Sequence, residues 1–257
     1  MCGAELRALP AGVQRVAAVL LAAGHGLPPV MLDNAAHTAQ QAAHALGVAV
    51  GQIAKSIVFR RKADNVAIVV VTSGDQRVDE SKLEALSWVC PDGRRLGRAD
   101  AAFVKTKTGF SIGGVSPLAH ATPAVIVMDA SLLRFDTIWA AAGHPQAVFQ
   151  LSPFDLQRLT GAAAIDVAVD AQREAAALQT AIEAVAGKAV SVRASGVMES
   201  PCISVCRMRH FEGMASEVCG GCFRTLDELL AWGRASDDGK RDVWQHIEQR
   251  MALLKSP

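Results

Sequence analysis

One stretch of the chain is almost entirely β-branched, and it strongly limits the folds that can form around it. Residues 66–71 read Val-Ala-Ile-Val-Val-Val. β-Branched side chains favour the pleated backbone of a strand, and an apolar run without polar alternation is typical of a strand buried on both faces. The run therefore predicts a central strand in an α/β domain.

Shorter patterns on either side of this strand predict helices and further strands. The strand predicted over 53–60 alternates, so Lys55 and Ile57 should point to one face and Ser56 and Val58 to the other. Helices are predicted over 12–25, 38–46, 80–86 and 101–106, and strands over 30–32, 124–128 and 147–151. A short helix should follow Ser152, with Phe154, Leu156 and Leu159 facing inwards. The first domain is predicted to span residues 1–170.

A glycine-containing loop is predicted over 108–117, which reads Thr-Gly-Phe-Ser-Ile-Gly-Gly-Val-Ser-Pro. Gly113 and Gly114 allow positive φ and a close approach to a ligand, while Pro117 stiffens the other end. Such a loop offers backbone N–H groups rather than side chains. A tight connection between two strands is the alternative. A phosphate loop is excluded because its Gly-x-x-x-x-Gly-Lys-Ser/Thr pattern is absent.

The charge balance argues against extensive contact with nucleic acid. The 26 basic and 25 acidic residues give a formal net charge of +1, so phosphate contact should be local. Tyrosine is absent and aromatic residues make up 5%, which does not suit a base-stacking surface. Basic residues at 60–62 should form a turn, and those at 94–98 a solvated surface. The apolar run 16–23 is too short to cross a bilayer, so we expect a cytoplasmic protein without membrane contact.

Four cysteines near the C-terminus follow a metal-ligand spacing. They are Cys202, Cys206, Cys219 and Cys222, whereas Cys2 and Cys90 are isolated. Four thiolates suit zinc or an iron–sulfur cluster, and a unit this small would gain stability from a metal. Four reduced structural cysteines are the alternative. We predict a Cys-rich metal-binding α domain over 198–257, joined through a helical and flexible linker over 171–197.

Several ordered segments together resemble the YbaK family of aminoacyl-tRNA editing domains, related to the insertion domain of bacterial prolyl-tRNA synthetase. These segments are His37-Thr38, 51–56, 73–79 and 108–117. The resemblance implies a mixed, largely antiparallel, barrel-like β-sheet with surrounding helices. It also implies hydrolysis of the ester that joins a wrong amino acid to the 3′ end of tRNA.

The resemblance also implies roles for individual residues, and no cofactor for this domain. Lys55 corresponds to the essential lysine, and 113–117 to the Gly-x-x-x-Pro loop that positions the aminoacyl end. The implied catalytic residues are Lys55, Gly113 and Gly114. The implied substrate-binding residues are Ser56, Ser73, Asp75, Val115, Ser116 and Pro117. Asp79 is a further candidate, although with Lys82 it equally fits a helix cap and a surface charge.

Residues 198–254 resemble a short bacterial domain of unknown function that is often described as a predicted iron–sulfur protein. This resemblance implies no mechanism. The expected function of the whole chain is trans-editing deacylation of mischarged aminoacyl-tRNA, with the tRNA acceptor end and an aminoacyl-tRNA synthetase as partners and no DNA. One alternative is a non-catalytic module that binds tRNA or a synthetase. Another is a metal- or redox-responsive interaction protein that acts through its C-terminal domain.

Overall fold

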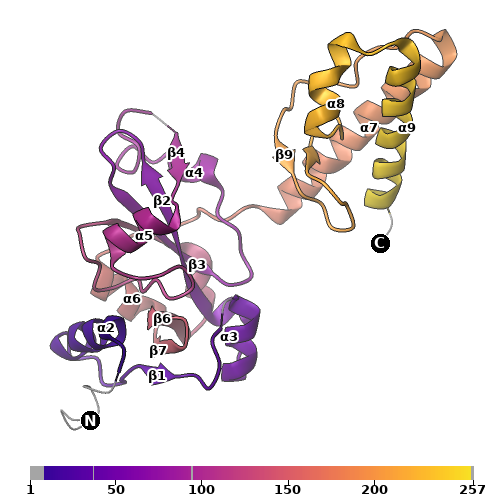
Figure 1. Cartoon of the computed structure of the whole chain (residues 1–257). Coiled ribbons are helices and arrows are strands. Elements are labelled where there is room, and N and C mark those ends of the chain that lie inside the picture. The colour runs from indigo at the N-terminus through magenta and orange to yellow at the C-terminus, as the bar shows by residue number, and fades with distance from the viewer. Residues whose placement is uncertain (1–8, 37, 94, 256–257) are drawn as a thin grey trace. The chain divides into compact units, whose positions relative to one another are not determined.

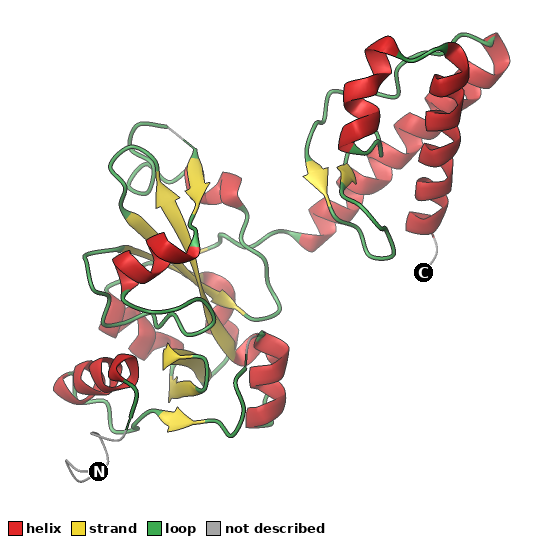
Figure 2. Ribbon diagram, in the orientation of Figure 1, coloured by secondary structure: helices red, strands yellow, loops and turns green. Residues whose placement is uncertain are grey.

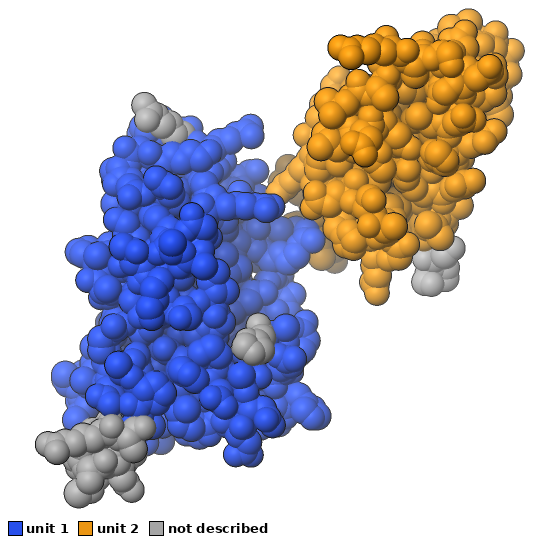
Figure 3. All heavy atoms as spheres, in the orientation of Figure 1, with its two compact units in different colours: residues 1–169 blue, residues 170–257 orange. Residues whose placement is uncertain are grey.

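The computed structural model describes residues 9–36, 38–93 and 95–255, and it divides the chain into two compact units (Figures 1 and 3). Unit 1 is Met1–Val169 and unit 2 is Asp170–Pro257. Cys2 and His37 lie outside the described residues. No helix in the described ranges is both long enough and apolar enough to cross a membrane.

Unit 1 is built on one mixed sheet in the order β1-β7-β6-β2-β3-β5-β8, with β4 paired to β2 (Figure 2). Its strands are β1 (Val30–Met31), β2 (Ile53–Arg61), β3 (Ala67–Ser73), β4 (Leu96–Arg98), β5 (Val125–Asp129), β6 (Ile138–His144), β7 (Ala147–Leu151) and β8 (Ala164–Ile165). Antiparallel pairing joins β1 to β7, β7 to β6, and β2 to both β3 and β4. Parallel pairing joins β2 to β6, β3 to β5, and β5 to β8. The predicted mixed α/β fold is confirmed.

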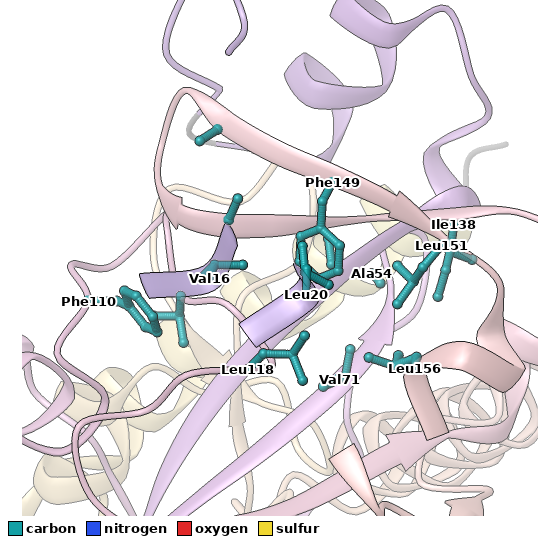
Figure 4. Close-up of a cluster of buried hydrophobic side chains, with 14 of the residues drawn as sticks. Val16, Leu20, Ala54, Val71, Phe110, Leu118, Ile138, Phe149, Leu151 and Leu156 are labelled. Atoms are coloured by element: carbon teal, nitrogen blue, oxygen red, sulfur yellow. The ribbon is translucent and has the colours of Figure 1, made fainter. Parts of the chain in front are cut away.

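The β-branched run forms β3, and each of its seven residues is buried. The strand separates two hydrophobic clusters, because Val71 belongs to one of them and Ile68 and Val70 belong to the other. Leu20 and Phe149 lie in the first cluster, which Figure 4 shows. Residues far apart in the sequence therefore share one core.

Helices cover the sheet, and side chains or glycines define their ends. They are α2 (Ala11–Ala22), α3 (Ala39–Leu46), α4 (Glu80–Glu84), α5 (Ala101–Thr108) and α6 (Pro153–Thr160). Thr38 forms a capping box with Gln41 at the start of α3, and Asp100 caps α5. The apolar face of α2 packs into the first cluster through Val13, Val16 and Leu20.

One inward-facing residue was predicted wrongly. Leu156 of α6 is fully buried and Leu159 packs against the first cluster, but Phe154 is 71% exposed. Two residues along a helix correspond to a rotation of about 200°, so Phe154 cannot share the buried face with Leu156.

Unit 2 is a small helical body with a two-stranded hairpin. Its elements are α7 (Ala171–Ser195), β9 (Met208–Arg209), β10 (Val218–Cys219), α8 (Leu226–Ala231) and α9 (Asp237–Lys255). The flexible part expected within the linker 171–197 is wrong, because α7 continues to Ser195 and ends at Gly196 in the left-handed conformation. Val185 and Val192 of α7 pack in one core with Ile247 of α9. The segment 171–197 thus supplies part of the core of unit 2.

Candidate active site

A gap in strand pairing exposes part of one edge of β2. On the edge away from β3, β2 pairs with β6 at Ile53 and Ala54, and with β4 at Phe59–Arg61. Between these pairings, residues 55–58 have no strand partner on that edge within the described part of the chain. A cavity of about 360 Å³ lies here, and its lining includes Lys55, Ser56 and Ile57.

The cavity is lined by apolar side chains and by polar groups that contribute nearly as much of its surface. The wall is completed by α3, the glycine loop, β6 and β7. The lining residues from these segments include Thr38, Ala39, Gln40, Ala42, Gly113, Val115, Trp139, Ala141, His144 and Val148. This combination of apolar side chains and convergent polar groups suits a small chemical group. The structure therefore brings Lys55, Ser56, Gly113 and Val115 together around one cavity.

The predicted lysine is half-buried and its ammonium is held in place. Lys55 Nζ donates a hydrogen bond to the carbonyl oxygen of Gly74 over 3.1 Å. Burial lowers the pKa of Lys55, and the negative charge of Asp75 offsets part of that effect. The side chain thus presents a desolvated cation or amine at the cavity wall.

Ser73 and Asp75 do not line the cavity, but they organise the turn that contains Gly74. Ser73 Oγ lies 2.5 Å from Gly51 O and 2.8 Å from Asp75 Oδ1, and its one hydroxyl proton can be donated to either acceptor. Arg134 donates to both carboxylate oxygens of Asp75, at 2.5 and 2.6 Å. Partial burial raises the pKa of Asp75, but hydrogen bonds from Ser73 and Arg134 outweigh it and hold this pKa below its ordinary value. These residues position the carbonyl group that binds Lys55.

Gly113 and Gly114 are each required to be glycine, but for different structural reasons. Gly113 lines the cavity and has φ = 89°, a conformation that strains other residues. A Cβ atom at Gly114 would lie 2.7–2.9 Å from backbone atoms of His144. The amide of Gly114 donates to Ser111 O over 3.0 Å, so it is used within the loop. In the described residues, the amides of Gly113 and Val115 make no hydrogen bond.

The remaining predicted loop residues, Ser116 and Pro117, are buried within the loop and do not line the cavity. Ser116 is fully buried, its Oγ accepts a hydrogen bond from Leu118 N, and its carbonyl lies 2.8 Å from His120 Nε2. Pro117 is also buried. The loop connects α5 to β5, so the alternative of a strand–strand connection is wrong.

Ser56 and Asp79 have different surroundings. Ser56 lines the cavity, and its Oγ is buried without a hydrogen-bond partner among the described residues. Asp79 instead caps α4 through Ser81 N and Lys82 N, while Lys82 pairs with Asp166 at 2.8 Å. The helix-cap alternative is therefore right for Asp79.

Several lining residues lay outside the predicted site list, among them Thr38, Trp139 and His144. His144 ends β6 after a bulge at Ala141 to His144, and its Nδ1 accepts a hydrogen bond from Gln146 N over 3.2 Å. Trp139 stands opposite Ile53 in the parallel pairing of β2 and β6. Parallel pairing between distant segments leaves no local sequence signal. The one local signal for the turn between β6 and β7 is the Gly143-His144 pair.

The four C-terminal cysteines belong to the hairpin region of unit 2. Cys206 interacts with Cys202 and Cys219. Ser204 N donates a hydrogen bond to Cys202 Sγ over 3.4 Å, and Arg224 Nε donates one to Cys222 Sγ over 3.3 Å. Across the described ranges, no group of three or more His, Cys, Asp or Glu side chains is arranged to hold a metal ion. The donor set itself, four thiols of which two accept N–H hydrogen bonds, fits a thiophilic metal.

Known proteins match the two units separately. Residues 33–159 match the family described as the aminoacyl-tRNA editing domain, and residues 200–251 match a protein family of unknown function, DUF1289. The uncharacterized protein YwhH of Bacillus subtilis (strain 168) is 32% identical over 128 residues, which are 50% of this chain and 78% of that protein.

Solved structures show the same fold for unit 1. One, described as a candidate trans-editing enzyme for prolyl-tRNA synthetase, is 37% identical with a TM-score of 0.57, and covers 63% of this chain and 100% of its own. The crystal structure of hypothetical protein APE2540 is 28% identical with a TM-score of 0.54, and covers 60% of this chain and 99% of its own. Sequence and fold agree, and through residues 33–159 the chain belongs to the aminoacyl-tRNA editing domain family.

Proposed function

We propose that unit 1 hydrolyses the ester bond of mischarged aminoacyl-tRNA. The observation that carries this proposal is that the Lys55 side chain and the Gly113-to-Val115 loop share one cavity at an unpaired edge of the sheet. An aminoacyl ester is already activated, so its hydrolysis depends mainly on orientation and on stabilisation of a developing oxyanion.

The residues of the cavity have separate roles in this reaction. The aminoacyl group binds in the cavity with its side chain against the apolar lining residues. A water molecule then attacks the carbonyl carbon. The bond from that carbon to the ribose oxygen breaks, the ribose oxygen takes up a proton, and a free amino acid and uncharged tRNA result. The Lys55 ammonium and the amides of Gly113 and Val115 stabilise the oxyanion. Gly114 has a steric role, because its own amide already donates to Ser111.

A panel of tRNAs charged with non-cognate amino acids tests this proposal. Because one similar structure is described in relation to prolyl-tRNA synthetase, the panel starts with tRNA for proline, with and without that synthetase. We expect hydrolysis of one or a few mischarged species well above the spontaneous rate. Binding of tRNA without hydrolysis of any species would support the non-catalytic alternative instead.

For unit 2 we propose that Cys202, Cys206, Cys219 and Cys222 hold zinc or an iron–sulfur cluster. The proposal is supported by the spacing of the four thiols and by the N–H donors to the Cys202 and Cys222 sulfurs. Elemental analysis of protein purified without oxygen should find zinc, or iron with sulfide and a brown colour. Cys219→Ser should lose the metal, and Cys90→Ser, whose thiol is buried in unit 1, should keep it. An equal metal content in the two variants would contradict the proposal.

A further inference from the structure

Three cations of unit 1 gather on one face of the β2–β4–α5 region. We call Arg60, Lys62 and Lys107 the basic cluster. The guanidinium carbon of Arg60 lies 5.6 Å from the centre of the Phe103 ring, and Lys107 Nζ lies 5.9 Å from the same centre. Arg60 stands opposite Gly97 of β4, and a Cβ atom at Gly97 would lie 3.1 Å from Lys62 Cε. Arg60 and Lys107 therefore lie against the same ring, and Lys62 lies beside Gly97, the residue opposite Arg60.

Among the described residues of unit 1, no carboxylate pairs with the basic cluster to neutralise its positive charge. No ion pair involves Arg60, Lys62 or Lys107 among the described residues. The acids nearby in the sequence have other roles: Asp64 binds Arg61 through two hydrogen bonds at 2.8 and 2.9 Å, and Asp100 caps α5 at Phe103 N. In a chain of net charge +1, such a local excess of positive charge is a feature that requires an explanation.

The basic cluster and the cavity are connected by the same two elements. β2 carries Lys55 at the cavity and Arg60 in the cluster, and five residues of strand span about 17 Å. Because successive side chains alternate, Lys55 and Arg60 point to opposite faces of β2, and an RNA strand that reaches both must pass the edge that is unpaired at residues 55–58 in the described structure. α5 carries Lys107 and leads through Gly109 into the loop with Gly113. Successive phosphates of a strand are farther apart than the axial rise of about 3.4 Å per nucleotide in duplex DNA, so this distance corresponds to only a few nucleotides.

We propose that the basic cluster binds backbone phosphates of the tRNA acceptor end, a few nucleotides from the esterified end, while the ester occupies the cavity. This inference rests on the proposed function and adds the surface that receives the RNA. Cations that bind phosphates give affinity without sequence selectivity, and each contact contributes about 0.9 to the salt dependence of binding.

Binding of an uncharged acceptor-stem hairpin RNA tests the inference without requiring catalysis. The variant Arg60→Ala/Lys107→Ala is compared with Arg158→Ala/Arg193→Ala, which loses the same charge from two exposed residues that already have carboxylate partners. We expect several-fold weaker binding for the cluster variant only, with a slope of log affinity against log salt reduced by about 2. Lys62→Glu, at an exposed position, should weaken binding as well.

The two proposals fail in different ways. Hydrolysis of a 3′-aminoacyl adenosine, which lacks the acceptor-stem phosphates, reports on the cavity alone and should be the same in wild type and the cluster variant. Equal hairpin binding by the two double variants, or no hairpin binding by wild type, would overturn the role of the basic cluster. An equal loss of adenosine-ester hydrolysis and hairpin binding in the cluster variant would also overturn this role, because the cluster would then be needed for folding rather than for RNA binding. Failure of wild type to hydrolyse any ester would count against the proposed function only.

Discussion

Gly114 and His144 approach each other so closely that the loop cannot carry a side chain at this point. A Cβ atom at position 114 would lie 2.7 Å from the carbonyl carbon of His144. Gly114 belongs to the loop after α5, and His144 ends β6. Since His144 and the neighbouring Gly113 both line the cavity, this contact sets the shape of its wall.

Gly114→Ala should therefore lower the rate of deacylation strongly, while the protein still folds. The added methyl group has backbone atoms on its far side, so the loop must move, at a cost of about 1–3 kcal/mol. A displaced loop amide typically lowers the rate by about 10²–10³. The matched control is Gly26→Ala, because nothing lies within 4 Å of a Cβ atom there. Equal rates for the two variants would show that the contact does not shape the site.

The charge of Asp75 should set the pH at which Lys55 loses its proton. Burial lowers the pKa of Lys55 and Asp75 raises it, so Asp75→Asn should lower this pKa further. If the ammonium form is active, the fall in rate on the basic side then moves to lower pH. Arg134→Gln should move it to higher pH, since the Asp75 charge is less neutralised.

The pH profile of deacylation, corrected for spontaneous hydrolysis, measures both shifts. Asp155→Asn serves as control, because Asp155 pairs with Arg158 on α6 and does not line the cavity. Shifts of the same sign in Asp75→Asn and Arg134→Gln would contradict the assignment of the basic limb to Lys55.

The free space beside Ala141 should determine which amino acids are accepted. Ala141→Leu places three more carbon atoms at the wall of a cavity of about 360 Å³. We expect kcat/KM to fall for every substrate, and most steeply for the largest amino acid that wild type accepts. Ala102→Leu, at an exposed position of α5, should leave the substrate range unchanged. A uniform fall across all substrates would indicate that the aminoacyl side chain binds elsewhere.

Stability of unit 2 should depend on pH through Glu228. Burial raises the pKa of this carboxyl group, but hydrogen bonds from Arg250 and from Thr225 N prevail and hold it below its ordinary value of about 4.5. The stabilisation is therefore complete above pH 4.5 and is lost as the pH falls through the lower pKa of the folded state. Glu228→Gln should destabilise unit 2 by about 1–3 kcal/mol at pH 7, and by less at lower pH.

Hydrogen exchange of the α8 and α9 amides, corrected for the intrinsic effect of pH, measures this difference. Glu248→Gln is the control, because Glu248 and its partner Arg193 are both more exposed than the Glu228–Arg250 pair. A difference between wild type and Glu228→Gln that grows as the pH falls would contradict the sign.

The sequence predicted those parts of the fold whose signals are local. The apolar run of β3, the helix that begins after Thr38, the helix-cap alternative for Asp79 and the glycine loop each depend on neighbouring residues. The walls of the cavity could not be predicted in this way. Trp139 reaches it through a parallel pairing with β2, and Arg134 binds Asp75 from 59 residues away. The extent of α7 was missed although Val185, Ala189 and Val192 continue the helical spacing of three to four residues almost to its end.

Loss of deacylation on removal of the Lys55 side chain tests the central claim most directly. The measurement is the single-turnover rate on the best mischarged tRNA for wild type, Lys55→Ala and Lys82→Ala. Lys82 is the matched control, because its ammonium binds Asp166 and Ala168 O and it does not line the cavity. We predict a rate at least about 10²-fold lower for Lys55→Ala and a nearly unchanged rate for Lys82→Ala. A rate for Lys55→Ala within twofold of wild type, with the fold intact, would contradict the account.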